Sequence, residues 1–457
     1  MTKGNDQNAF PITDTALRWL EIILTKRFDH KWHLSRVDAG LCLHLVGAEG
    51  SIFYDTLCEG FTQPHSDQPC TYWDAEFEGW LSVLGESLPA PGVPELLSPL
   101  IEQLGSGQVI HYDILGLVYW MLARVEEIGR TDLDEHERFP AYSSHALKHG
   151  YLDRPVVDEW LHLLGQVIQR QWPGIVLKKQ QARTFVTCDV DTPFDYVGKL
   201  TKVPRRVFGD LFKRKSIKSA FLTIAGNFLS HFENFRLDGY YQGLLFILEE
   251  NEKLGQRVNF YFIPEKTHND FDQPVSLYDT RLRNLLKMIH LRGHHIGIHP
   301  GYSTSSSPNL FAKSVSTLRK VLNELGIDLE DFECRQHYLK FQIPSTPRLW
   351  KNNGITSDTS IGYADHPGFR CGTCFEYPLF DAVEQQQFGV REKPLILMER
   401  SVISARYLGL GYTESSLEMM KYYKDTCHTV GGVFTLLWHN SHLTTEIDRR
   451  FYRELIK

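Results

Sequence analysis

From residue 184 onward, short apolar runs alternate with longer stretches of helical spacing. The apolar runs are 184–187, 258–263, 295–298 and 433–438, and the helical stretches include 240–254, 279–291 and 311–325. Strands that alternate with helices in this way are typical of a parallel sheet or barrel rather than of a β-sandwich. The expected fold class of this part of the chain is therefore α/β.

Two carboxylates follow the first apolar run. Asp189 and Asp191 come directly after Phe185-Val186, and residues two apart on a strand point the same way. Both side chains should therefore project together from the end of a buried strand. One carboxylate can hold a cation while the other takes a proton from water on that cation. The alternative is an Asp-rich turn that closes the strand at Pro193.

A histidine-rich segment at 291–303 is also expected to form a strand. His295 and His299 have the spacing of a helical metal pair, but the surrounding glycines and Pro300 disfavour a helix. On a strand, residues four apart are separated by roughly 13 Å, too far to share one ion. His299, at the strand end, is therefore the candidate ligand, with a structural histidine as the alternative.

Four motifs occur along the chain in the order found in polysaccharide deacetylases. They are the Asp189/Asp191 pair, Gly-His-His-Ile-Gly-Ile-His at 293–299, Arg-Gln-His-Tyr-Leu at 335–339, and Leu-Trp-His-Asn at 437–440. The chain resembles carbohydrate esterase family four over about residues 181–457. The resemblance implies a distorted (β/α) barrel that uses a divalent metal to remove acetyl groups from sugars. Residues 10–160 resemble the extra N-terminal region of a bacterial branch related to deacetylases of O-antigen and capsule clusters.

The resemblance makes Asp191 and His299 metal ligands. The family's second histidine ligand falls at Ser303 in this chain, and a hydroxyl is a poorer zinc ligand than an imidazole. His337 stands where the family's Arg-x-Pro motif has its proline, and it is the candidate replacement. The expected cofactor is a divalent metal, zinc first, with cobalt or nickel as alternatives.

The resemblance also implies catalytic roles. Asp189 would be the general base, and Arg335 would pair with it and favour its ionised form. His439 would be the general acid that protonates the leaving amine, with Tyr338 and Trp438 as substrate-binding residues. Without the resemblance, Arg335 could simply form a salt bridge. Residues 438–442 could simply be the end of a strand that leaves the core.

A polar, glycine-rich region after residue 357 is expected to contact substrate. Active sites of barrels lie at the carboxyl ends of the strands, where such loops gather, so Asp358 and Arg370 are candidate substrate contacts. Both could equally stabilise their loop. Cys371 and Cys374 have the spacing of a metal or redox pair, but no second pair lies at a suitable distance, and free thiols are expected.

Composition and the termini bear on location and partners. A net charge of −7 argues against a nucleic-acid-binding surface. The N-terminus lacks a signal-peptide core, no segment approaches a membrane span, and eight scattered cysteines fit reduced thiols, so a cytoplasmic protein is expected. The basic segment 201–218 is expected to form an amphipathic helix, which could also contact anionic lipid or a phosphorylated glycan carrier.

The expected domains are an N-terminal α+β accessory domain at 1–150, a connecting helix at 151–180, and the barrel at 181–457. Within the first two, helices are expected at 15–27, 110–127 and 155–170, and a strand at 41–46. The leading function is a metal-dependent deacetylase that acts on an N-acetylated sugar of a surface polysaccharide or its precursor. The alternatives are an inactive glycan-binding or scaffold protein, and a hydrolase of a formamide or cyclic amide.

Overall fold

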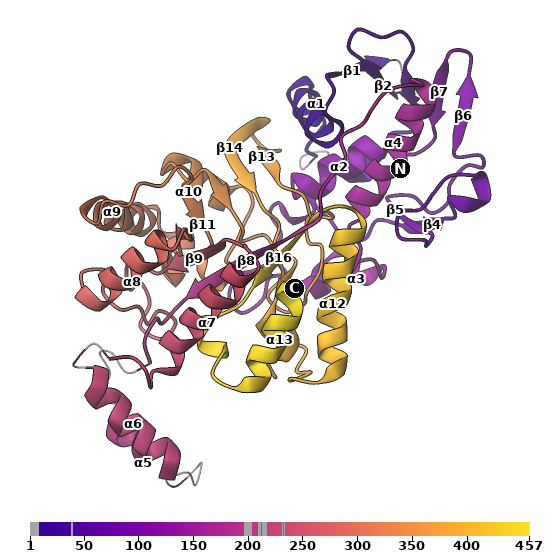
Figure 1. Ribbon diagram of the computed structural model, residues 1–457. Coiled ribbons are helices and arrows are strands. Elements are labelled where there is room, and N and C mark those ends of the chain that lie inside the picture. Colours follow the sequence, from indigo (N-terminus) through magenta and orange to yellow (C-terminus); the bar gives the residue numbers. More distant parts are fainter. Residues whose placement is uncertain are drawn as a thin grey trace. The chain divides into compact units, whose positions relative to one another are not determined.

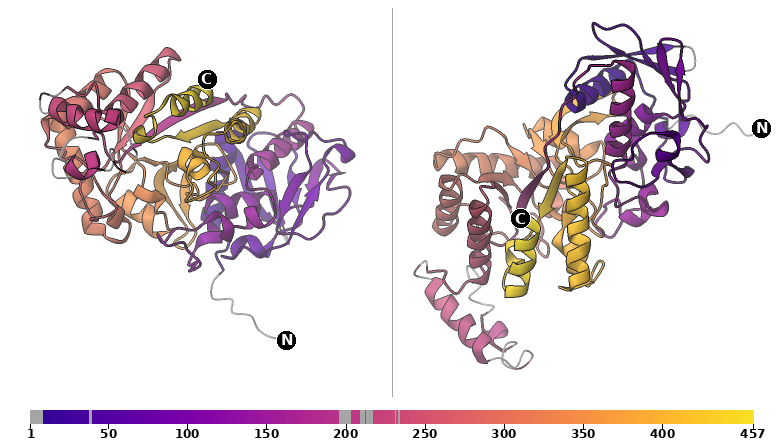
Figure 2. Two further views of the ribbon diagram at one scale, coloured as in Figure 1. Left: turned by 90° about the horizontal axis from the view of Figure 1, so that it is seen from below. Right: turned by 45° about the vertical axis from the view of Figure 1, so that its right-hand side comes forward.

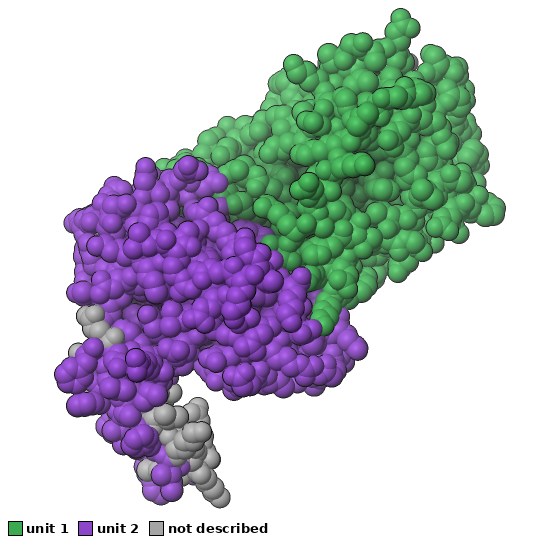
Figure 3. Space-filling model, viewed as in Figure 1, with its two compact units in different colours: residues 1–184, 339–397, 421–435 green, residues 185–338, 398–420, 436–457 purple. Residues whose placement is uncertain are grey.

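The computed structural model describes residues 9–37, 40–195, 203–208, 212, 217–230, 232 and 234–457. The chain divides into two compact units, each built from three stretches of sequence (Figure 3). Unit 1 contains Met1–Thr184, Leu339–Leu397 and Lys421–Thr435, and unit 2 contains Phe185–Tyr338, Met398–Met420 and Leu436–Lys457. The expected division into contiguous domains at 150 and 180 stays a prediction.

The largest sheet has nine strands in the order β13-β14-β12-β11-β10-β9-β8-β16-β15. Four of them, β8 to β11, are neighbours in unit 2, and β8 with β9, β9 with β10, and β10 with β11 pair in parallel. The strands are β8 (Arg183–Val190), β9 (Val258–Phe262), β10 (His295–Ile298), β11 (Glu333–Cys334), β12 (Ser357–Asp358), β13 (Tyr377–Asp381), β14 (Gln386–Glu392), β15 (Leu397–Met398) and β16 (Val433–Leu437).

The parallel strands of unit 2 are buried, as their apolar sequences require. Every residue of β9 and β10 is buried, which is typical of parallel strands with both faces covered. Helices α7 (Gly239–Lys253), α8 (Thr280–Leu291) and α9 (Pro308–Glu324) alternate with these strands along the chain and lie beside them (Figure 1). Asp238 and Asp279 cap α7 and α8 through their side chains, which satisfies amide groups at each helix start.

The expected α/β class is confirmed, but a complete (β/α) barrel is not. Among the described residues, the order of the large sheet ends at β13 on one side and β15 on the other. In addition, β13 and β14 pair antiparallel, whereas a (β/α) barrel contains only parallel strands. The structure contains a mixed sheet. The expected alternation of strands and helices is found in its parallel part.

The N-terminal part of unit 1 combines helices with two smaller sheets. A five-stranded sheet has the order β1-β2-β3-β7-β6, and β4 pairs with β5. These strands are β1 (Trp32–Val37), β2 (Gly40–Leu45), β3 (Ile52–Tyr54), β4 (Cys70–Trp73), β5 (Leu88–Pro91), β6 (Ile101–Leu104) and β7 (Gly107–Ile110). The helices are α1 (Asp14–Phe28), α2 (Ile114–Leu122), α3 (His145–Lys148) and α4 (Val156–Gln171). The expected helices at 15–27 and 155–170 and the strand at 41–46 correspond to α1, α4 and β2.

The helix expected at 110–127 is shorter than predicted. Asp113 caps α2 by accepting a hydrogen bond from the Gly116 amide at 2.7 Å, and the helix ends before Ala123. Arg124 then has a φ of 52°, in the left-handed region, which ends an α-helix. The apolar run is therefore split into the end of β7, the buried helix α2 and a short 3₁₀ turn.

A buried ion-pair network follows that turn. Glu127 accepts hydrogen bonds from Arg124 Nη2 at 2.7 Å and, through its other oxygen, from Arg370 Nη2 at 2.7 Å. Arg370 Nη1 also donates to the carbonyl of Gly362 at 2.9 Å. Removing one partner of a buried pair costs about 3–5 kcal/mol, so the network fixes the 362–370 loop against the turn after α2 within unit 1.

The remaining helices are α5 (Val203–Phe208), α6 (Ile217–Ser230), α10 (Ser345–Asn352), α11 (Glu399–Ile403), α12 (Glu414–Thr429) and α13 (Glu446–Ile456). Helices α5 and α6 lie side by side in unit 2 (Figures 1 and 2). The helix expected at 201–218 falls partly outside the described residues. Within the described residues no helix combines the length and apolarity needed to cross a membrane. All eight cysteines are free thiols, including Cys371 and Cys374.

Candidate active site

The polar residues that follow β8, β10 and β11 meet at one edge of the sheet in unit 2. Asp191 follows β8, His299 follows β10, and His337 lies three residues beyond β11. The carboxyl ends of neighbouring parallel strands share an edge, so residues far apart in sequence come together there. His439 reaches the same place from the end of β16, within 3.9 Å of Asp191.

Asp191 is the centre of this group. Its Oδ1 lies 3.3 Å from His299 Nε2 and 3.5 Å from His337 Nε2. One ligand atom from each of the three residues lies within 4.8 Å of the others. The Asp191 side chain is 35% exposed, yet its Oδ1 is buried and has no hydrogen-bond partner among the described residues.

The three histidines are oriented in the same way. Nδ1 of His299 faces the carbonyl oxygen of Arg335 at 2.5 Å, Nδ1 of His337 faces Asp272 at 2.9 Å, and Nδ1 of His439 faces Glu399 at 2.7 Å. An acceptor at Nδ1 places a proton on that nitrogen and leaves Nε2 for a ligand or a transferable proton. Each Nε2 is directed to Asp191.

Asp189 sits beside the cluster in a separate ion pair. Arg335 Nη1 lies 3.3 Å from Asp189 Oδ1, and Arg335 Nη2 donates to Thr187 Oγ1 at 3.0 Å. The other oxygen of Asp189 is 3.6 Å from His299 Nε2. Both Asp189 and Arg335 are buried, so the pair is shielded from water and salt.

Nearby charges hold Asp191 and His439 in their charged forms. Burial alone would raise the pKa of Asp191, but the imidazoles of His337, His299 and His439 outweigh burial and hold it well below its usual range. Burial alone would lower the pKa of His439, but Glu399, with Asp191 and Asp189, raises it to about 9. His439 is therefore protonated at neutral pH, as a general acid must be.

The residues present suit a divalent metal. Two imidazole nitrogens and one carboxylate oxygen are a common donor set for zinc, and also suit cobalt and nickel. The buried Asp191 Oδ1, which lacks a hydrogen bond within the described chain, is the kind of atom that a cation would satisfy. Burial opposes the charged form of His299, yet nearby Asp189 and Asp191 raise its pKa, so metal binding would release protons.

Ser303 does not join this group. Its Oγ donates to the carbonyl of Thr267 at 3.3 Å, and its amide donates to Thr267 Oγ1 at 3.0 Å. His337 lies within reach of Asp191 instead. Its role as a ligand, like every role assigned from the sequence, stays a prediction.

Two residues were missed by the sequence analysis. Asp272 orients His337 and also accepts hydrogen bonds from the amides of Thr267, His268 and Tyr302. Glu399 accepts hydrogen bonds through one oxygen, Oε1, from Nδ1 of both His439 and His442. The sequence offered two signals, which were not used: Asp272 stands two residues after Asp270, the same spacing as Asp189 and Asp191, and Glu399 follows the apolar run 395–398.

The candidate substrate-binding residues lie in different settings. Tyr338 is partly exposed, with a φ of 62°, beside His337. Trp438 is fully buried, and its Nε1 donates to the His442 carbonyl at 3.2 Å. Asp358 and Arg370 belong to unit 1 and are buried, where Asp358 accepts a hydrogen bond from Ser360 Oγ at 2.7 Å. Arg370 is occupied by Glu127, so both have the loop-stabilising contacts that were the stated alternative.

Comparisons with known proteins identify little of the chain. Residues 65–173 match a family of unknown function, DUF7033, and no curated protein matches. Among solved structures, a candidate polysaccharide deacetylase from Mycobacterium smegmatis is similar at 16% identity and a TM-score of 0.37, covering 62% of this chain and 86% of that one. Puue allantoinase is similar at 12% identity and a TM-score of 0.33, covering 48% of this chain and 67% of its own.

We predict that the protein binds one divalent metal per chain and that His337, not Ser303, contributes to binding. Asp191→Ala and His337→Ala should abolish stoichiometric metal in purified protein measured by plasma mass spectrometry. Asp272→Asn should weaken affinity by roughly 10–100-fold, because it removes the negative charge and one of the two acceptor oxygens that hold His337 and the surrounding amides.

Ser303→Ala is the matched control and should retain metal, because its hydroxyl bonds to Thr267 rather than facing Asp191. Loss of metal in Ser303→Ala together with retention in His337→Ala would contradict the assignment.

Proposed function

We propose that the protein is a metal-dependent hydrolase that removes the acetyl group from an N-acetylated sugar of a surface polysaccharide or its precursor. The observation that carries the proposal is the convergence of three imidazole Nε2 atoms on Asp191, with the Asp189–Arg335 pair alongside. The candidate metal ligands, the candidate base Asp189 and the candidate acid His439 thus lie together at one edge of the sheet. The resemblance of the four sequence motifs to polysaccharide deacetylases supports the substrate class.

The chain's own residues can supply both proton transfers. A divalent cation held by Asp191, His299 and His337 would supply Lewis acidity at the site. Asp189 accepts a proton from the attacking water, and Arg335 keeps the Asp189 carboxylate in position for that task. His439, held by Glu399, donates a proton to the amine nitrogen as the carbon–nitrogen bond breaks. Water and amide thus give acetic acid and an amine, with one proton taken by Asp189 and one given by His439, and the acid then loses its proton to become acetate.

The proposed reaction takes place in the cytoplasm on a precursor made inside the cell. The eight free thiols support a reducing compartment. An inactive glycan-binding protein would have no use for an oriented acid and a paired base in the same cluster, and that favours an enzyme. Residues 1–150 are proposed to be an accessory region.

We predict that Asp189→Asn lowers kcat for acetate release by roughly 10²–10⁴-fold, which is the usual contribution of a general base. The assay would use metal-loaded protein and a panel of N-acetylated sugar nucleotides and lipid-linked glycans. Metal content of Asp189→Asn should stay near that of the wild type, because Asp189 is outside the proposed ligand set. An active wild type whose rate is unchanged in Asp189→Asn would remove Asp189 from the mechanism.

A second prediction concerns pH. The rate should fall on the alkaline side, because the proposed acid His439 loses its proton there, and a cation on Asp191 should place this limb below the metal-free pKa of about 9. Glu399→Gln removes the negative charge that raises this pKa, so the alkaline limb should move to lower pH. The full pH profile of kcat in the wild type and in Glu399→Gln measures the shift. Identical limbs in the two proteins would argue against His439 as the acid.

We also propose that the protein contacts an anionic membrane through α5 and α6. Ile217, Phe221, Ile224 and Phe228 repeat along α6 at intervals of four and three residues, which places them on one face, and each is more than half exposed. Phe208 of α5 is similarly exposed. Residues 199–218 contain eight Lys and Arg against one Asp. Apolar side chains flanked by cations are typical of helices that lie at an anionic lipid surface.

We predict that the protein sediments with vesicles containing phosphatidylglycerol and not with pure phosphatidylcholine. Phe221→Glu should weaken the partition coefficient roughly tenfold or more, because a buried phenyl ring is worth about 1.5–3 kcal/mol. Leu291→Glu, at an 83% exposed apolar residue of α8, is the matched control and should bind as the wild type does. Equal losses in both variants, or no vesicle binding at all, would refute the membrane contact.

A further inference from the structure

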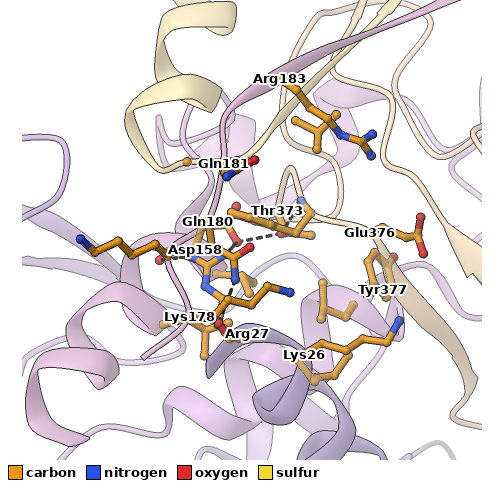
Figure 4. Close-up of a pocket in the computed structure, with 18 residues that line it drawn as sticks. Lys26, Arg27, Asp158, Lys178, Gln180, Gln181, Arg183, Thr373, Glu376 and Tyr377 are labelled. Carbon is orange, nitrogen blue, oxygen red and sulfur yellow. Dashed lines mark hydrogen bonds and ion pairs between the residues drawn. The ribbon is translucent and has the colours of Figure 1, made fainter. Parts of the chain in front are cut away.

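Unit 1 contains a cavity of about 580 Å³ that is separate from the histidine cluster of unit 2. It is bounded by α1, α4, the segment 178–183 and the segment 373–377, with a contribution from Gly431 and Val433 (Figure 4). A cavity of this size is in the range of small-molecule sites, which run from about 300 to 1,000 Å³.

The two carboxylates in the cavity wall are already neutralised. Asp158 faces Arg27 Nη1 at 3.3 Å and accepts hydrogen bonds from Thr373 Oγ1 at 2.8 Å and the Cys374 amide at 2.9 Å. Glu376 pairs with Arg391 at 3.2 Å. Asp158 thus balances Arg27 and Glu376 balances Arg391, and neither carboxylate pairs with any other cation of the wall.

Four cations in the same wall have no such partner. Lys26, Lys178, Lys179 and Arg183 line the cavity and are exposed, and none forms an ion pair within the described part of the chain. Figure 4 shows Lys26, Lys178 and Arg183 on different parts of the wall. Unpaired charges of one sign around a concave surface produce a positive potential inside it.

The rest of the wall is apolar or aromatic. Ile23, Leu122, Leu161 and Val433 contribute aliphatic surface, and Phe375 contributes a ring whose face is covered by the Arg27 guanidinium at 4.0 Å. A cavity with both features fits a molecule that has a highly charged end and a planar or apolar end. A simple inorganic anion would use the cations and leave the apolar surface wet.

We infer that this cavity binds a nucleotide, with its phosphates among the four unpaired cations and its base against the apolar wall. Arginine presents a planar fork that matches phosphate oxygens, and lysine supplies a compact positive charge. Part of the wall, including Leu122, Asp158 and Leu161, lies within residues 65–173 that match the family of unknown function. The inference does not depend on the deacetylase proposal, since no residue of the histidine cluster takes part.

The test is calorimetric titration of ADP into the full-length protein with EDTA present, so that metal at the histidine cluster does not contribute. ADP should bind with one site per chain, and adenosine and inorganic phosphate should each bind at least tenfold more weakly. Lys178→Glu/Arg183→Glu should weaken ADP binding roughly tenfold or more. Raising the salt concentration should weaken it too, because exposed charges are screened.

Lys31→Glu/Lys351→Glu is the matched control. Both lysines are exposed residues of unit 1 outside the cavity wall, and the change in net charge is the same. The control should keep ADP affinity within about twofold of the wild type, since exposed charges that do not line the cavity are screened by water and salt. The inference is overturned if ADP does not bind, if adenosine binds as tightly as ADP, or if the two double variants lose affinity equally.

Discussion

The pairing of Asp191 with three imidazoles is the interaction on which the rest of the candidate site depends. A carboxylate at the end of a buried strand is costly unless positive charge or hydrogen bonds compensate it. Here the compensation comes from His299, His337 and His439, and each of these is held by an acceptor on its far side. The site is therefore a set of fixed dipoles and charges arranged around one oxygen atom before any ligand arrives.

The groups that accept a hydrogen bond from the Nδ1 atoms of the histidines matter as much as the histidines themselves, because they fix each ring. Asp272 ties together the backbone amides of Thr267, His268 and Tyr302 and also fixes His337. This places His337 beside Asp191 while Ser303 is turned to Thr267. Ser303 stands where the resemblance expects a histidine ligand. The loop that Asp272 holds places the imidazole of His337 beside Asp191 in its stead.

The sequence predicted those parts of the fold and of the candidate site that have a regular pattern of apolar residues. The alternation of apolar runs and helical stretches predicted β8, β9 and β10, and parallel pairing then brought Asp191 and His299 to one edge. Asp272 comes from a loop that has no period to read, and Glu399 begins a helix of only five residues, which is too short to show one, so both were missed. The antiparallel β13–β14 pair was missed because it follows from a local turn at Gln385, whose φ is 52°. Arg370 was a candidate substrate contact, with loop stabilisation as the alternative, because its partner Glu127 is 243 positions away and no spacing in the sequence pairs the two.

The spacing of Asp189 and Asp191 has a consequence for how this chain can diverge. Asp189 lies in β8 and Asp191 directly follows its last residue, so one inserted or deleted residue between Thr187 and Asp191 would change the side to which Asp191 projects. The intervals between motifs carry no such constraint, since loops and helices absorb length changes at little cost. In relatives of this protein, the number of residues between Asp191 and His299 should therefore vary. The five-residue segment 187–191 should have no insertions or deletions.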